Sequence, residues 1–155
     1  MKIYLVQHAE AVPKDENANR PLTKKGAEDV DRMADFLGSM KLQVENVFHS
    51  GKTRAVQTAE GLAMTMDVTG KFEKLDGMGG DDDVVAFRDE MPASVSGDTM
   101  LVGHQPFMGK LASLLLTGSD DIVPVEFQKG CVVCLGRGDK DTWRLEWMLT
   151  PAIFG

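Results

Sequence analysis

The sequence predicts an α/β fold, a three-layer sandwich in which helices flank a mostly parallel mixed sheet. Two observations lead to this prediction. Apolar segments with strand character alternate along the chain with segments whose apolar residues recur at helical spacing. Near the end, two further strand-like segments enclose a short polar stretch, which predicts a β-hairpin and therefore a mixed sheet. The 155 residues suit one domain of ordinary size, so we expect a single domain over residues 1–155.

The first predicted elements are a strand, a polar loop and an amphipathic helix. Residues 3–6 are continuously apolar and rich in β-forming side chains, which is typical of a core strand. A polar loop follows through Asn19, and Thr23 is placed as the N-cap of a helix that ends near Gly38. The apolar stripe predicted for this helix comprises Ala27, Val30, Met33, Leu37 and Met40.

The middle of the chain is expected to contain two shorter strands and two helices. Residues 47–49 and residues 72–75 are the strand candidates. Ser50 can cap the helix that follows the first of them, and the apolar stripe of that helix comprises Ala55, Ala59, Leu62 and Met66. A loop rich in glycine and aspartate runs from Gly77 to Asp83, and a short helix is expected over residues 84–91.

The last third of the chain contains a core strand, a buried helix and the hairpin. Residues 99–102 predict the strand, and the sequence GHQP follows it directly. Pro106 suits the first turn of a helix, and residues 108–116 have the composition of a buried one. The predicted hairpin joins residues 131–135 to residues 143–149.

Cys131 and Cys134 form a lone CxxC pattern, which also occurs in redox and metal sites. The pair lies in an apolar run, and residues three apart in a strand point to opposite faces. No second cysteine pair completes a zinc site. We therefore interpret both cysteines as core residues.

Composition and charge narrow the classes of partner. Hydrophobic residues make up 43% of the chain and charged residues 26%, and the net charge is −7. This acidic balance argues against general nucleic-acid binding, which needs a basic surface, although a single pocket can still be locally positive. The longest apolar stretch, around residues 111–116, is too short to span a membrane, and no targeting segment is visible. We therefore expect a cytoplasmic protein without membrane or nucleic-acid partners.

Three polar clusters each follow an apolar strand. They contain His8, the segment from Ser50 to Arg54, and His104. Ligands of open α/β sheets bind beyond the carboxyl ends of the strands, so we expect the clusters to converge. Arg54 lies at the start of a predicted helix, and its forked guanidinium can bind two phosphate oxygens. One of the two imidazoles can attack phosphorus, and the other can bind the phosphate.

Other interpretations of these residues remain open. A histidine at a strand end is often structural, and His49 is assigned to that role. A metal site built from His8, His104 and Glu10 is an alternative, but a neighbouring arginine would repel the metal. Arginine and a protonated histidine can together cover the charge of a transferring phosphoryl group, so we expect neither a metal nor another cofactor.

Taken together, four segments resemble the histidine phosphatase superfamily, which is also called the phosphoglycerate mutase-like or RHG superfamily. They are IYLVQHA at residues 3–9, RPLTKKG at residues 20–26, SGKTRAVQTA at residues 50–59 and LVGHQP at residues 101–106. They occur in family order over about two-thirds of the chain. The early RPLTxxG segment and the short chain are most similar to the SixA-type phosphohistidine phosphatases. The resemblance implies the phosphoglycerate mutase-like fold.

The resemblance also implies roles for individual residues. His8 matches the nucleophile that becomes phosphohistidine, Arg54 the second arginine of the phosphate pocket, and His104 the second histidine of that pocket. Arg20 matches an arginine near the pocket mouth, and Ser50 lies at the pocket edge. The predicted phosphate-binding set comprises Gln7, Arg20, Ser50, Arg54, His104 and Gln105.

The sequence departs from the family signature Arg-His-Gly, because it reads Gln7-His8-Ala9. Glutamine donates neutral hydrogen bonds, but it supplies neither the positive charge nor the forked, bidentate geometry of the arginine guanidinium. Losing a charged hydrogen bond costs about 1.5–3 kcal/mol, which corresponds to a loss of rate of roughly ten- to a hundredfold. Ala9 adds a methyl group where the family has glycine. Arg20 or a nearby lysine is a hypothetical compensating cation.

The general acid is left open among six carboxylates, which are Glu10, Glu73, Asp76, Asp81, Asp82 and Asp83. SixA-type proteins often lack a dedicated acid, which suits a phosphohistidine substrate because imidazole leaves more easily than an alkoxide. The predicted function is therefore phosphohistidine hydrolysis through a phosphohistidine enzyme intermediate, with a phosphorylated protein or a small phosphorylated substrate as partner. The alternatives are a small-molecule phosphomonoesterase and a phosphate-binding member with weak turnover. The oligomeric state is left open.

Overall fold

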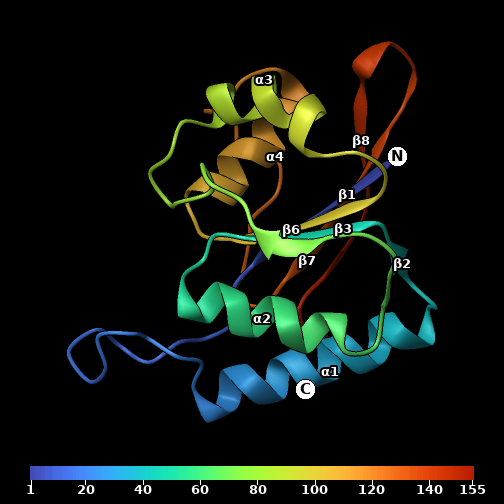
Figure 1. The fold of residues 1–155 in the computed structure, drawn as a ribbon. Helices are drawn as coiled ribbons and strands as arrows, with labels where there is room; N and C mark the ends of the chain where they lie inside the picture. The colour runs from blue at the N-terminus through green and yellow to red at the C-terminus, as the bar shows by residue number, and fades with distance from the viewer.

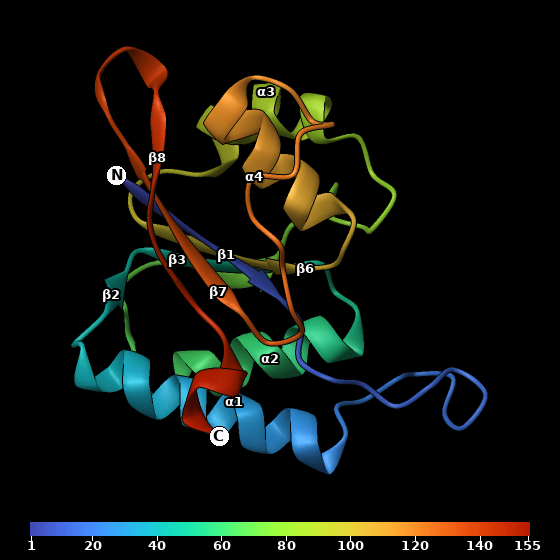
Figure 2. The same cartoon turned by 180° about the vertical axis from the view of Figure 1, so that it is seen from behind.

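A computed structural model describes the backbone of residues 1–155 and every side chain except those of residues 92–94. The chain forms a sheet between two pairs of helices (Figures 1 and 2). The strands are β1 (Lys2–Gln7), β2 (Gln43–Val44), β3 (Asn46–His49), β4 (Asp67–Val68), β5 (Phe72–Lys74), β6 (Thr99–Gly103), β7 (Val132–Arg137) and β8 (Trp143–Leu149). The helices are α1 (Lys24–Ser39), α2 (Thr53–Ala63), α3 (Val84–Ser94) and α4 (Phe107–Thr117), with short 3₁₀ helices η1 (Asp139–Asp141) and η2 (Pro151–Phe154).

Six strands form the central sheet in the order β5-β3-β6-β1-β7-β8. The first four strands in this order run parallel to one another, whereas β7 is antiparallel to both β1 and β8. The predicted mostly parallel mixed sheet is confirmed, and so is the hairpin. β2 and β4 form a separate two-stranded sheet, which was not predicted because two residues are too few to show a period.

The two faces of the sheet carry separate cores, and alternation along β1 supplies both. Ile3 and Leu5 pack into the core beneath α3 and α4, whereas Tyr4 and Val6 pack into the core against α1 and α2. Figure 1 shows the two helix pairs on opposite sides of the sheet. Burying one such side chain contributes about 1.5–3 kcal/mol, so the three-layer arrangement follows from apolar residues on both faces of the strand. Within the described residues, no helix has the length and hydropathy needed to cross a membrane.

Several predicted boundaries and packing positions need correction. The helix predicted to end at residue 91 continues to Ser94, and α2 begins after Lys52, so Ser50 is not its N-cap. Ala27 and Met40 were predicted in the apolar stripe of α1 but are exposed, because Ala27 lies in an open groove between α1 and α2 and Met40 is the C-cap. Thr23 caps α1 as predicted, since its hydroxyl accepts a hydrogen bond from the backbone N–H of Gly26.

Candidate active site

The three polar clusters meet at one edge of the sheet. β3, β6 and β1 are neighbours and run parallel, so their carboxyl ends lie side by side. Ser50 follows β3, His104 follows β6 and His8 follows β1. The centroids of the two imidazole rings are 5.0 Å apart. Residues from distant parts of the chain therefore form one site beyond the strand ends, where open α/β sheets bind their ligands.

The surroundings of His8 select one tautomer of its imidazole. Nδ1 lies 2.7 Å from the carbonyl oxygen of Ala9, which can only accept a hydrogen bond, so Nδ1 carries the proton. Nε2 accepts a hydrogen bond from Nε of Arg54 at 3.3 Å. The ring is therefore neutral, with the lone pair of Nε2 directed toward a guanidinium, which is how an imidazole nucleophile must be presented to an anionic substrate.

His104 is buried opposite His8 and is held through its own Nε2. That nitrogen lies 2.6 Å from the hydroxyl oxygen of Ser50, whereas Nδ1 is buried without a hydrogen-bond partner. An unpaired buried polar atom costs about 1–3 kcal/mol, so this nitrogen is unsatisfied in the free protein.

Burial lowers the pKa of both imidazoles to about 4. For His8 the neighbouring charge of Arg54 lowers the pKa further, and for His104 the charge of Arg54 and the repulsion that a protonated His8 would exert act in the same direction. His104 is therefore neutral near pH 7 in the free protein. Its predicted role as a phosphate-binding cation requires the phosphoryl anion itself to draw the proton onto the ring.

The lowered pKa values predict that the protein loses stability between about pH 6.5 and pH 4. In this window the unfolded chain binds protons on His8 and His104 that the folded chain does not, so the free energy of unfolding rises with pH. Urea denaturation at about pH 5 and pH 7 measures this difference. The His104→Asn variant should show a shallower dependence, and a flat wild-type profile across the window would contradict the prediction.

Thr58 links the turn that follows β1 to Arg54 and was missed by the sequence analysis. Its buried hydroxyl accepts a hydrogen bond from the backbone N–H of Ala9 at 3.1 Å and donates one to the carbonyl oxygen of Arg54 at 2.8 Å. Thr58 thus joins the turn after β1 to the first turn of α2. A threonine one turn after Arg54 on the buried side of an otherwise apolar stripe was the available signal.

Replacing Thr58 by valine is expected to destabilise the protein by about 1–3 kcal/mol, because the shape is kept while the buried N–H of Ala9 loses its acceptor. Chemical denaturation measures the change. Thr69→Val is the matched control, since Thr69 is exposed, and its effect should stay within about 0.5 kcal/mol. Equal effects of the two substitutions would show that the hydroxyl of Thr58 does not hold this junction.

Gln7 occupies the position that precedes His8 at the end of β1. Its side chain is buried and its Oε1 has no hydrogen-bond partner. The backbone N–H of Gly130, on the segment before β7, bonds to the carbonyl oxygens of Gln7 and His8 at 3.0 and 3.2 Å. This contact brings the exposed Lys129 near the site, where its charge lowers the pKa of His8, a cation that the sequence analysis did not single out.

Arg20 and Gln105 occupy different places relative to the histidines. Arg20 is half-buried, and its Nε donates to the carbonyl oxygen of Val12 at 3.0 Å. The charge of Arg20 lowers the pKa of Arg54 and of both histidines, so Arg20 is close enough to interact electrostatically with the site. Gln105 is exposed, and its Oε1 accepts a hydrogen bond from the backbone N–H of Gly109 at 2.7 Å, so its side chain closes the first turn of α4.

Most of the candidate acids are engaged outside the site. Glu10 accepts a hydrogen bond from the hydroxyl of Thr23 at 2.7 Å, and Glu73 and Asp76 pair with neighbouring lysines at 3.5 and 3.0 Å. In the part of the chain that the structure describes, no group of three or more His, Cys, Asp or Glu side chains is placed to hold a metal ion. The alternative of a metal site that includes Glu10 is therefore not assembled.

The loop after β5 passes close to His104. A Cβ atom at Gly80 would lie 3.0 Å from the carbonyl oxygen of Gln105 and 3.7 Å from Cβ of His104. On this loop the carboxylate of Asp82 bonds to the N–H of Gly79, and that of Asp83 caps α3. Asp81 is exposed and is the remaining candidate acid of the loop.

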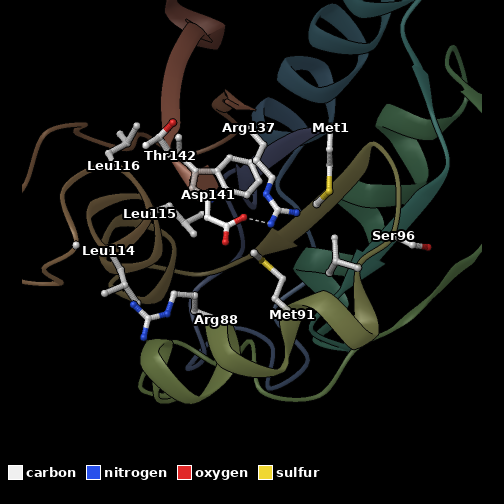
Figure 3. Close-up of a pocket in the computed structure, with 13 residues that line it drawn as sticks. Met1, Arg88, Met91, Ser96, Leu114, Leu115, Leu116, Arg137, Asp141 and Thr142 are labelled. Carbon is white, nitrogen blue, oxygen red and sulfur yellow. Dashed lines mark hydrogen bonds and ion pairs between the residues drawn. The ribbon is translucent and has the colours of Figure 1, made fainter. Parts of the chain in front are cut away.

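Two cavities lie at opposite ends of the strands. One, of about 430 Å³, is lined by the loop before α1 and by the start of α2, including Arg20 and Arg54. The other, of about 730 Å³, lies between α3, α4 and the hairpin, as Figure 3 shows, with Met91, Leu114 and Arg137 in its walls. The larger cavity includes Met1, at the start of β1, so it lies roughly 20 Å along the strand from His8. Of these two cavities, the smaller one includes Arg54, whose Nε donates a hydrogen bond to Nε2 of His8.

The paired imidazoles beside an arginine form a site suited to an anionic phosphoryl group. Residues 3–77 match the family model of the histidine phosphatase superfamily, branch 1. The chain is 23% identical to the phosphohistidine phosphatase SixA of Escherichia coli (strain K12) over 155 residues, which cover 97% of this chain and 94% of that protein. It is 31% identical to an uncharacterized protein of Picosynechococcus sp. over 123 residues, which cover 76% and 74% of the two chains. The chain belongs to the histidine phosphatase superfamily and is of the SixA type.

Solved structures share this fold over the whole chain. The protein histidine phosphatase SixA complexed with tungstate superposes with a TM-score of 0.85 at 22% identity, covering 100% of both chains. The alpha-ribazole phosphatase from Shigella flexneri superposes with a TM-score of 0.80 at 15% identity, covering 97% of both chains. These likenesses show the phosphoglycerate mutase-like fold that the resemblance implied.

Proposed function

We propose that the chain is a phosphohistidine phosphatase in which His8 is the nucleophile. The observation that carries the proposal is the state of His8, whose Nδ1 donates to Ala9 and whose Nε2 keeps an unprotonated lone pair beside Arg54. The proposed phosphate-binding groups are Arg54, His104, Ser50, Gln7 and Arg20, whereas the contact that Gln105 makes with α4 supports a structural role for it. We also propose that residues 1–155 act as one catalytic domain, and a cytoplasmic location stays a prediction.

The first step is an in-line displacement at phosphorus. Nε2 of His8 forms the new P–N bond while the P–N bond to the substrate imidazole breaks, and the other nitrogen of the leaving ring carries a proton, so it leaves neutral. The Nδ1–H of His8 keeps its hydrogen bond to Ala9 and shares the positive charge that develops on the ring. Arg54 and the protonated His104 bind the equatorial oxygens and offset their charge.

The second step frees the enzyme. A water molecule attacks phosphorus from the side that the leaving imidazole has vacated, and the P–Nε2 bond of His8 breaks. One proton of the water stays on the phosphate product, and the other is released to solvent. The lone pair on Nε2 is then restored and Arg54 donates to it again. No acid is needed to protonate His8, because its neutral tautomer is the leaving group.

The substrate class is proposed from the surroundings of the leaving group. Among the residues that the structure describes, no carboxylate is hydrogen-bonded to His8, Arg54 or His104. An alkoxide leaving group needs a proton in the transition state, whereas imidazole does not, so this arrangement favours a phosphohistidine over a phosphate ester. The name of the E. coli relative supports the same class.

The test is a comparison of phosphate release from a phosphohistidine protein with release from a panel of phosphomonoesters that includes sugar and nucleotide phosphates. We expect kcat/KM for phosphohistidine to exceed that of every ester by about a hundredfold or more, which corresponds to at least ~2.7 kcal/mol of transition-state discrimination. A higher value for any ester would instead favour the small-molecule phosphomonoesterase. Phosphate binding without turnover of either class would indicate a binding protein.

A further inference from the structure

The cavity beside Arg54 is lined by an unusual concentration of positive charge. Its walls, which come from the segment between β1 and α1 and from the start of α2, include four cations, Lys14, Arg20, Lys52 and Arg54. The lining residues that the structure describes contain no acidic side chain. The chain as a whole has 24 acidic and 17 basic residues, so this cavity is strongly positive on a negatively charged molecule.

The four cations are not neutralised by the protein itself. In the part of the chain that the structure describes, none of them forms an ion pair with a carboxylate, whereas eight of the other lysines and arginines do. Asp15 and Glu16 follow Lys14 in the loop but do not line the cavity. The cavity therefore presents more positive charge than one phosphoryl group would neutralise.

Arg20 is fixed at the mouth of this cavity. Its backbone has φ of 48°, which a residue with a side chain adopts only when it is held, and its N–H bonds to the carbonyl oxygen of Asn17 at 3.0 Å. The bond from Nε to the carbonyl of Val12 leaves the two terminal nitrogens of the guanidinium to face a ligand. Arg54 stands between this cavity and Nε2 of His8, so an anion bound here would lie next to the transferred phosphoryl group.

Lys14 and Lys52 form the outer rim of the cavity and their side chains are exposed. The segment that carries Lys14, drawn in blue between β1 and α1, projects beyond the helices in Figures 1 and 2. A rim of exposed lysines on a projecting loop is accessible to side chains on the surface of another protein, whereas a small molecule would gain most from the inner arginines.

We propose that this cavity binds acidic side chains that flank the phosphohistidine of a protein substrate. The proposal rests on the proposed function and adds the kind of protein that the enzyme selects. Arg54 and the histidines bind the phosphoryl group, while Lys14, Arg20 and Lys52 pair with neighbouring carboxylates of the substrate. Acidic proteins without such a phosphorylated segment are repelled by the negative surface elsewhere.

The test measures binding separately from turnover. Two phosphohistidine peptides of equal length are compared, one with glutamates beside the phosphohistidine and one with glutamines in their place. Both are titrated by fluorescence anisotropy against the His8→Ala variant, which cannot consume them. We expect the glutamate peptide to bind about tenfold more tightly, a size set by a few partly exposed ion pairs.

The additional Lys14→Gln/Lys52→Gln substitutions should reduce this preference to about twofold or less. Lys41→Gln/Lys140→Gln is the matched control, because it removes the same charge at exposed positions away from the cavity, and it should leave the preference intact. Equal affinities for the two peptides, or a preference that the Lys14 and Lys52 substitutions leave unchanged, would overturn the proposal. Turnover of the same peptides by the unmodified protein tests the proposed function independently, so the two can fail separately.

Discussion

The His8→Ala variant is expected to lose phosphate release from a phosphohistidine protein by roughly a thousandfold or more. The proposed route has a covalent intermediate on Nε2, and without that nitrogen the phosphoryl group has no acceptor except water. The backbone of Arg54 keeps its position in the variant, because its carbonyl oxygen accepts a hydrogen bond from Thr58. Stopped reactions with purified protein measure the residual rate.

Two observations make this result specific for the nucleophile. The unmodified protein, quenched in base during turnover, should carry a phosphoryl group on His8 that acid removes, whereas the variant should carry none. Binding of inorganic phosphate to the variant should persist, because Arg54 and His104 remain. Phosphate release by His8→Ala at a rate near that of the unmodified protein would exclude His8 as the nucleophile.

Replacing Gln7 by arginine is expected to raise kcat/KM by about ten- to a hundredfold, which corresponds to one additional charged hydrogen bond in the transition state. Gln7 is the last residue of β1, directly before His8, and its Oε1 is buried without a partner. An arginine at this position would replace the unpaired amide oxygen of Gln7 by a guanidinium that can donate two hydrogen bonds to the phosphoryl group. The same charge disfavours protonation of His8 and keeps its Nε2 nucleophilic.

The matched variant is Gln7→Lys, which adds the charge without the planar fork and should give a smaller increase in kcat/KM. A buried cation without a bound anion is costly, so Gln7→Arg should also lower the stability of the free protein, and inorganic phosphate should restore it. An unchanged kcat/KM for both variants would indicate that another cation, such as Lys129 or Arg20, already fills the position of the missing charge.

Much of this protein could be predicted from local sequence patterns. The alternation of strand and helix, the cap at Thr23 and the hairpin were evident because side chains repeat every two residues in strands and every 3.6 in helices. The chemistry-bearing residues were recognisable because they follow apolar strands directly. The two-residue strands were not, since their pairing joins residues that are distant in the sequence, and the last turn of α3 was not predicted either.

The tertiary structure alone decided how these residues act on one another. The neighbouring positions of β3, β6 and β1 bring His8 and His104 together, and the carbonyl oxygen of Ala9 selects the tautomer of His8. Burial, which no single segment determines, lowers the pKa of both imidazoles. The cationic cavity likewise combines a projecting loop with the start of a helix more than thirty residues later. Local periodicity encodes which face of an element is apolar, whereas hydrogen bonds and electric fields between elements exist only once the chain has packed.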